Sequence, residues 1–236
     1  MTAYYENILR PGDVVIDIGA NLGVHALLAA HLVGPEGRVH AIEASPTIFG
    51  QLKHNLYVNR ATNVIAYNVA VSDRATTVPV FHDPDAAGLT TILSRMSLTS
   101  GVSKEADISA RPLAEIVPLS ELRLARLIKI DVEGAEWLVV AGIKEILPTL
   151  NPKVEFIIEI TPYALEQFGV TIAEFVDVFA TNGFTAWRIP NEYSIDFYTH
   201  RQILQLQLLE NNGFQHADVL FRKHEPPPRP APGARS

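Results

Sequence analysis

The stretch Val14-Val15-Ile16-Asp17-Ile18-Gly19-Ala20-Asn21-Leu22-Gly23 decides the fold of this chain. Its first half is a short apolar run rich in β-branched residues, which is typical of a buried strand. The run contains one acid and passes directly into a turn with two glycines, which predicts a tight change of direction from a strand to a helix. In an open parallel sheet, ligands bind in the crevice beyond the carboxyl ends of the strands. The stretch therefore predicts one wall of a ligand site.

A second stretch far downstream, Leu127-Ile128-Lys129-Ile130-Asp131-Val132-Glu133-Gly134-Ala135-Glu136, repeats this pattern. It is again a short buried-strand pattern that ends in a carboxylate and runs into small and acidic residues. Acids that open a helix favour its dipole by roughly 0.3–1 kcal/mol each, which accounts for Glu136 and partly for Glu133. The dipole does not account for Asp131, which precedes the helix. Two acidic strand ends in one chain suggest a single site, built around a ligand with polar or cationic groups.

Apolar strand-like runs alternate with amphipathic stretches along most of the chain, which predicts a doubly wound, Rossmann-like α/β fold. We expect a mostly parallel sheet of seven strands, at Val14–Ile18, Arg38–Ile42, Val64–Val69, Leu127–Ile130, Val154–Ile160, Phe184–Ile189 and Asp218–Arg222. Helices are expected at Gly23–Leu32, Pro46–Asn59, Ala135–Leu147 and Ile172–Asn182. Ser45 before Pro46, and Thr171 with Glu174, are N-cap signals. Gly183 suits the left-handed position that ends the last helix.

Two segments are longer than the connections that this fold needs. Between the third and fourth strands, residues 76–126 hold an expected added β-hairpin of Val78–His82 and Leu89–Leu93, with a turn at Asp83-Pro84-Asp85. Residues 190–217 carry a helix-like stretch, Ile203–Leu209. Both segments can form the substrate pocket or a lid, or simply pack on a sheet edge. We expect one domain over residues 1–224 and a disordered, proline-rich tail over residues 225–236.

Composition narrows the class of protein. The 236 residues carry a net charge of −7 without a continuous basic stripe, which argues against a nucleic-acid partner. The absence of cysteine excludes disulfides and thiolate chemistry. No apolar run approaches the roughly 18 residues of a membrane span, and no secretory signal is present. We therefore expect a cytoplasmic enzyme without a membrane partner. Its oligomeric state is open, and Ile203–Leu209 can serve a homodimer interface as easily as a lid.

The first strand end and the residues after it suit a particular ligand. Gly19 and Gly23 let a ligand approach the main chain, and the following helix start suits a carboxylate. Asp17 can take an ammonium group, directly or through water. Glu43 follows Gly23 by about 20 residues, where such folds place a carboxylate on ribose hydroxyls. Asn21 breaks the three-glycine pattern that a dinucleotide favours. We interpret the ligand as S-adenosylmethionine.

A further pair of polar residues follows the third strand. Ser72 or Asp73 can hydrogen-bond the adenine amino group by position, or can form a simple turn.

These residues closely resemble those of FkbM-type S-adenosylmethionine-dependent methyltransferases. The likeness rests on Asp17–Gly23, Glu43-Ala44-Ser45-Pro46 and Lys129–Glu136, and it extends from about Pro11 to Lys223. The resemblance implies a class I methyltransferase fold and methyl transfer to a hydroxyl oxygen of a sugar, polyketide or other natural product. It also implies two groups of binding residues. The cofactor would contact Asp17, Gly19, Ala20, Asn21, Gly23, Glu43 and Ala44, and Asp131 would border both cofactor and substrate.

Methyl transfer to an alcohol needs alignment of the reactants, and a general base typically adds roughly 10²–10⁴ in rate. The candidate bases are Asp131, Glu133, Glu159 and His25, and we favour Glu133 or Glu159. His25 is as readily a packing histidine. Mg²⁺ at Asp131, Glu133, Glu159 and His200 is possible but not expected, because their spacing is no metal signature.

Two other classes of protein stay open at this point. A nicotinamide-dependent oxidoreductase would use the same sheet but would want the three-glycine turn. A non-catalytic nucleotide- or ligand-binding domain would keep Gly19 and Gly23 yet tolerate the loss of Asp131 and Glu133.

Overall fold

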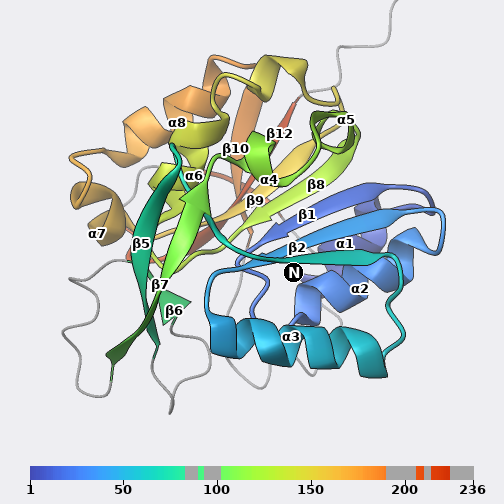
Figure 1. Ribbon diagram of the computed structural model, residues 1–236. Coiled ribbons are helices and arrows are strands. Elements are labelled where there is room, and N and C mark those ends of the chain that lie inside the picture. Colours follow the sequence, from blue (N-terminus) through green and yellow to red (C-terminus); the bar gives the residue numbers. More distant parts are fainter. Residues whose placement is uncertain (83–89, 93–101, 190–205, 210–213, 224–236) are drawn as a thin grey trace, which may run out of the picture.

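A computed structural model describes residues 1–82, 90–92, 102–189, 206–209 and 214–223 (Figure 1). Several sequence-based expectations lie outside these residues: the turn at 83–85, His200, most of the segment 190–217, and the tail from 225 to 236.

The central element is an eight-stranded sheet with the order β11-β10-β12-β9-β8-β1-β2-β3. Its strands are β1 (Val14–Ile18), β2 (Arg38–Glu43), β3 (Val64–Asn68), β8 (Ala125–Ile130), β9 (Glu155–Ile160), β10 (Phe184–Ile189), β11 (Gln207–Leu208) and β12 (Ala217–Lys223). The ladders from β3 to β9 are parallel, whereas β12 runs antiparallel to both β9 and β10. The α/β fold and all seven expected strands are confirmed, and β11 adds an eighth.

The chain leaves β1 toward β2 and β3 in one direction, and later leaves β8 toward β9 in the other. The strand order thus reverses between β1 and β8, and their carboxyl ends meet at that reversal. Such a switch point is where open α/β sheets bind ligands.

Helices cover both faces of the sheet (Figure 1). They are α1 (Thr2–Ile8), α2 (Val24–Val33), α3 (Pro46–Val58), α4 (Leu113–Ile116), α5 (Leu119–Leu122), α6 (Glu136–Ile143), α7 (Pro162–Glu166) and α8 (Ile172–Ala180). Buried side chains of α1, α2 and α3 pack against one face, and those of α6 and α8 against the other. Phe179 of α8 stacks on Phe221 of β12, with ring centroids 4.1 Å apart, and so joins this helix to the sheet. The two layers hold the sheet rigidly beneath its carboxyl edge. In the described part of the chain, no helix is long and apolar enough to cross a membrane.

The expected helix caps are confirmed. The Ser45 hydroxyl accepts the Ile48 N–H at 3.1 Å, and Thr171 and Glu174 form a reciprocal capping box. Helix ends were less predictable. The third expected helix, 135–147, is interrupted, because α6 ends at Ile143 and a 3₁₀ turn follows at Leu147–Thr149.

The segment between β3 and β8 forms a second, smaller sheet and not a lone hairpin. Its order is β4-β7-β5-β6, with strands β4 (Ala70–Val71), β5 (Thr76–His82), β6 (Thr90–Thr91) and β7 (Ser103–Arg111). The expected hairpin is present where β5 pairs with β6, but the main partner of β5 is β7. The sequence of β7 does not show the apolar pattern of a strand, because only Ile108 and Ala110 of that strand are buried.

The helix-like pattern of Ile203–Leu209 was misleading in its described part. Gln207 and Leu208 form the short strand β11, which pairs with Arg188 and Trp187 of β10. Edge pairing to β10 satisfies their backbone groups there.

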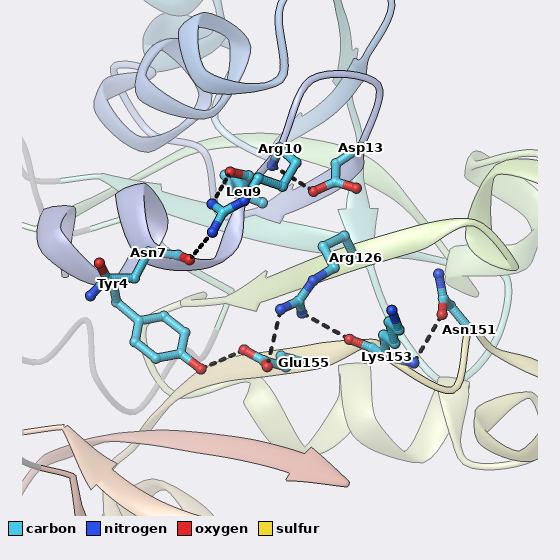
Figure 2. Close-up of polar contacts among 9 residues, drawn as sticks. All are labelled: Tyr4, Asn7, Leu9, Arg10, Asp13, Arg126, Asn151, Lys153 and Glu155. Carbon is cyan, nitrogen blue, oxygen red and sulfur yellow. Dashed lines mark hydrogen bonds and ion pairs between the residues drawn. The ribbon is translucent and has the colours of Figure 1, made fainter. Parts of the chain in front are cut away.

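Helix α1 was not expected, because seven residues are too short for a periodic pattern and too short to be stable alone. Figure 2 shows how the rest of the fold holds it. The Tyr4 hydroxyl donates to the carboxylate of Glu155, which also pairs with Arg126 at 3.2 Å. At the helix end, the Arg10 side chain donates to the carbonyl oxygen of Asn7 at 2.9 Å. This anchoring buries the neighbouring Tyr5 beside the sheet.

Candidate active site

A cavity of about 320 Å³ opens at the switch point of the sheet. Its wall comes from the ends of β1, β2, β8 and β9, the start of α2, and the segment after β3. Among the predicted site residues, those that line it are Gly19, Ala20, Asn21, Glu43, Ala44, Asp131, Glu133, Glu159 and His25. Four predicted residues do not line it: Asp17, Gly23, Ser72 and Asp73. The size is at the lower end of the range for small-molecule sites.

Gly19 lies just past the end of β1, against the main chain that follows β8. Its φ is +79°, and a Cβ placed there would come within 1.7 Å of the Asp131 carbonyl oxygen. The Asp131 N–H donates to the Ile18 carbonyl oxygen at 3.0 Å, which joins the two strand ends. Only glycine fits a position with both a left-handed backbone and no room for a side chain.

Gly23 serves the packing of α2. Its φ is +91°, and a Cβ there would approach Leu52 Cδ1 to 2.6 Å. The tight start of α2 against α3 thus explains this glycine without any contact to a ligand.

Glu43 organises the turn after β1. Its carboxylate is buried and accepts the Asn21 N–H at 2.9 Å and the Ser45 N–H at 2.8 Å. Burial raises the pKa of Glu43, and these two N–H groups oppose that rise. A carboxylate has about four lone-pair sites, so Glu43 can hold both loops and still accept hydrogen bonds from a ligand in the cavity.

Asp17 lies behind the cavity wall. It is fully buried, and its position on β1 is directly opposite Lys129 of β8. The Lys129 Nζ is 3.8 Å from Asp17 Oδ1 and 2.9 Å from Asp131 Oδ2. Burial raises the pKa of Asp17 to about 6, with the Lys129 ammonium acting in the opposite direction. Lys129 itself lines the cavity, so this lysine bridges the two predicted acids.

Ser72 and Asp73 hydrogen-bond to each other, Oγ to Oδ1 at 3.1 Å. The Ser72 carbonyl packs against Gly142 of α6, where a Cβ would come within 2.4 Å of it. The residues before them, Val69, Ala70 and Val71, line the cavity instead. The structure therefore offers an apolar wall in that region.

Three carboxylates gather in the cavity wall near the ends of β8 and β9. Oxygen atoms of Asp131, Glu133 and Glu159 all lie within 4.8 Å of one another. Glu133 has a left-handed backbone, with φ +52°, and its carbonyl oxygen accepts the Thr91 hydroxyl at 2.9 Å. Glu159 also pairs with His216 at 3.3 Å. We call Asp131, Glu133 and Glu159 the acid cluster.

The three acids differ in proton affinity. Burial favours the neutral form of Asp131, but Lys129 outweighs it and holds the pKa of Asp131 below its ordinary value. Burial and the charge of Asp131 raise the pKa of Glu133 to about 7. The same two causes raise the pKa of Glu159 to about 9. At neutral pH, Asp131 is thus ionised, Glu159 carries a proton and hydrogen-bonds to Asp131, and Glu133 is poised between the two forms.

Glu136 stabilises the turn that carries the acid cluster. One carboxylate oxygen accepts the N–H groups of Val132 and Gly134, at 3.0 and 3.1 Å. Burial raises the pKa of Glu136 to about 7. This residue has no place in the cavity wall, in agreement with its expected role at the helix start.

His25 and Tyr5 complete the region beside Lys129. Burial and the charge of Lys129 lower the pKa of His25 to about 4, so its ring is neutral at pH 7. Its centroid lies 5.6 Å from that of Tyr5, which is fully buried. Sequence reasoning missed Lys129 as a residue of the cavity wall, and it did not place Tyr5 beside His25. For Lys129 a signal was available, because a lysine inside a buried strand requires a buried partner.

Comparison with known families gives one match that covers most of the chain. A family model described as the methyltransferase FkbM domain matches residues 17–215.

Two curated proteins are similar over a shorter region. The chain is 33% identical over 163 residues to the 31-O-demethyl-FK506 methyltransferase FkbM of Streptomyces tacrolimicus, covering 58% of this chain and 62% of that protein. It is 28% identical over 142 residues to the hexuronic acid methyltransferase AglP of Haloferax volcanii, covering 59% and 53%. The chain thus spans less than two thirds of the length of either relative.

Solved structures agree in fold. An rRNA methylase from Streptococcus thermophilus superposes with a TM-score of 0.53 at 13% identity, over 95% of this chain and 94% of that one. A precorrin-6y C5,15-methyltransferase from Geobacter metallireducens superposes with a TM-score of 0.50, also at 13% identity, over 93% and 85%. At such low identity these likenesses concern the fold alone.

Proposed function

The chain belongs to the FkbM-domain methyltransferase family, and on that premise we propose that it transfers the methyl group of S-adenosylmethionine to a hydroxyl oxygen of a small molecule. The observation that carries the proposal is the meeting of a glycine-built turn and an acid cluster in one cavity at the switch point of the sheet. The turn suits a cofactor, and the acids suit the removal of a proton.

The cavity fits this cofactor. Gly19 and Asn21 line the cavity just after β1, and Glu43 offers lone pairs for ribose hydroxyls. The apolar side chains of Ile42, Val69 and Val71 suit the faces of an adenine ring. When bound, S-adenosylmethionine supplies a methyl group on a sulfonium, which is a strong electrophile. We assign cofactor binding to Gly19, Asn21 and Glu43, with Asp17 acting through Lys129 and not by direct contact.

Glu133 is the best-placed general base. It lines the cavity, and its pKa of about 7 matches a base that works near neutral pH. Glu159, the other favoured candidate, carries a proton at neutral pH and therefore suits hydrogen-bond donation better. His25 is neutral but binds protons too weakly at a pKa of about 4 to compete.

The names of the two curated relatives support a hydroxyl-bearing acceptor such as a sugar or another natural product. The net charge of −7 supports a small acceptor over a nucleic acid. We propose that this enzyme serves natural product biosynthesis in the cytoplasm.

Methyl transfer can be tested with S-adenosylmethionine carrying a tritium-labelled methyl group. The acceptor panel contains a methyl glucoside, a methyl glucuronoside, a macrolide alcohol and ribosomal RNA, each with and without EDTA. We expect O-methylation of at least one alcohol, unaffected by EDTA and lost in Glu133→Gln. The exposed Glu145→Gln is the matched control and should keep full activity. Labelling of RNA alone, or of a nitrogen or carbon atom, would contradict the proposal.

A further inference from the structure

Lys129 has no role in the proton transfer of the proposed function, although it lies in the same cavity wall as the acid cluster. It is 3% exposed in the middle of the sheet, and it is the only lysine or arginine in the cavity wall formed by the described residues. Lysine is almost never fully buried unless it is paired. A buried ammonium group at the cavity wall therefore calls for a specific role.

Two carboxylates hold this ammonium. Asp17 lies opposite Lys129 in the parallel pairing of β1 and β8, with Nζ 3.8 Å from Oδ1. Asp131 lies two residues further along the chain, just past the end of β8, with Nζ 2.9 Å from Oδ2. Burial alone would lower the pKa of Lys129, but Asp131 and Asp17 raise it above its ordinary value. The lysine therefore stays charged throughout the working pH range.

The remaining titratable groups near Lys129 come from every element packed around it. They are the Met1 amino group and Tyr5 at α1, His25 of α2, Glu133 just before α6 and Glu136 at its start, Glu159 of β9, His216 just before β12 and Asp218 in it. Most of these groups are acids or are neutral at pH 7. Lys129 is thus the main positive charge that the acid cluster faces.

We propose that Lys129 is a positioning residue of the methyl-transfer site. It holds Asp131 in the ionised form, so the proton that the acid cluster keeps lies on Glu159. Glu133 then remains free to act as the base. The contact of Lys129 with Asp131 at 2.9 Å, inside a cluster whose oxygens lie within 4.8 Å, carries this inference. The assignment of Glu133 as the base rests on the proposed function. The order in which Asp131 and Glu159 ionise is independent of that function.

The proton balance explains why that order matters. As the acceptor oxygen bonds to the methyl carbon, the carbon–sulfur bond breaks and its electron pair stays on sulfur, while the hydroxyl proton passes to the Glu133 carboxylate. Three carboxylates this close cannot all ionise near neutral pH, because like charges raise one another's pKa. The Lys129 ammonium decides which one ionises first. Without it, the cluster as a whole binds protons more tightly, and less of Glu133 is free.

The test combines Lys129→Met, Lys129→Arg and the exposed Lys144→Met as a matched control. Carboxyl carbons labelled with ¹³C are titrated by NMR, and Asp131→Asn and Glu159→Gln assign the signals. In the unmodified protein, Asp131 should ionise first and Glu159 last. In Lys129→Met, the pKa of Asp131 should rise by about 1 to 3, the usual effect of a close opposite charge. Lys129→Arg should restore most of the original order, and Lys144→Met should change nothing.

A second measurement keeps the inference testable if Lys129→Met does not fold. Titration of the unmodified protein alone decides the order, and Asp131 that stays protonated after Glu159 has ionised would overturn the inference. An unchanged Asp131 titration in folded Lys129→Met would overturn it as well. Calorimetry with S-adenosylhomocysteine runs beside the titration. Failure of the unmodified protein to bind this ligand would count against the proposed function, whereas the titration order alone decides the role of Lys129.

Discussion

Replacing Gly19 by alanine tests the close approach of β1 and β8 on which the whole site depends. The added Cβ would lie 1.7 Å from the Asp131 carbonyl oxygen, in a backbone with φ +79°. The neighbouring atom is main chain, so it cannot rotate away as a side chain would. Either the strand ends separate, or the turn after β1 moves.

The cost has two parts that a control can separate. A left-handed backbone costs a non-glycine residue about 1–2 kcal/mol. Overpacking adds typically about 1–3 kcal/mol. Gly183 has φ +81° and no atom within 4 Å of its Cβ position, so Gly183→Ala carries only the first part. We expect Gly19→Ala to lose about 2–5 kcal/mol of unfolding free energy and Gly183→Ala about 1–2 kcal/mol.

Urea unfolding followed by circular dichroism measures both variants, and calorimetry with S-adenosylhomocysteine measures binding. Gly183→Ala should bind like the unmodified protein, whereas Gly19→Ala should bind at least about tenfold more weakly, a difference of 1.4 kcal/mol. Equal stability losses in the two variants, with binding intact in both, would refute the close contact at Gly19.

Three other substitutions follow from the site. Glu43→Gln should weaken S-adenosylhomocysteine binding by about tenfold or more in calorimetry. The NH₂ group of the new amide would face the N–H of Asn21 or Ser45, two donors together, so a hydrogen bond worth about 1.5–3 kcal/mol is lost. Unchanged binding would remove Glu43 from the cofactor site. Glu133→Gln should cut the rate of methyl transfer about 10²–10⁴-fold while S-adenosylhomocysteine binding persists. The unmodified enzyme should gain activity as pH rises through about 7, where Glu133 loses its proton. A flat pH profile would argue against this base. Glu136 has a folded-state pKa of about 7 against an ordinary 4.5, so its contribution to stability is present below pH 4.5 and is lost as pH rises through 7. The unfolding free energy should thus fall over that pH range by at most about 3 kcal/mol, and Glu136→Gln should make this pH dependence weaker. An equal pH dependence in both proteins would contradict a buried Glu136 with a raised pKa.

The large sheet was predictable because its strands are apolar runs with clear ends. In β1 and β8, every residue but one is buried, and each run stops at a turn, so the pattern has little ambiguity. The small sheet was less predictable. Strand β7 exposes most of its side chains, and its partner β5 is fixed by long-range pairing that no local pattern encodes.

The site residues were predictable where a carboxylate lies at or just after the end of a strand. Glu43 and Asp131 line the cavity because parallel strands bring their carboxyl ends to one edge. Ser72 and Asp73 missed the cavity by one or two residues, since the packing of Gly142 against Ser72 decides where the chain turns. The placement of Asp17 behind Lys129 depends on the register between β1 and β8, which only the folded sheet defines.

Calorimetric titration of the purified protein with S-adenosylmethionine, S-adenosylhomocysteine and NAD tests the central claim most directly, namely that the cavity at the switch point holds an adenosyl cofactor. We predict saturable, one-to-one binding of both adenosyl ligands, weakened in Glu43→Gln, and no binding of NAD. Binding of NAD, or heats for the adenosyl ligands that match buffer dilution, would contradict the assignment of this cavity as a methyl-donor site.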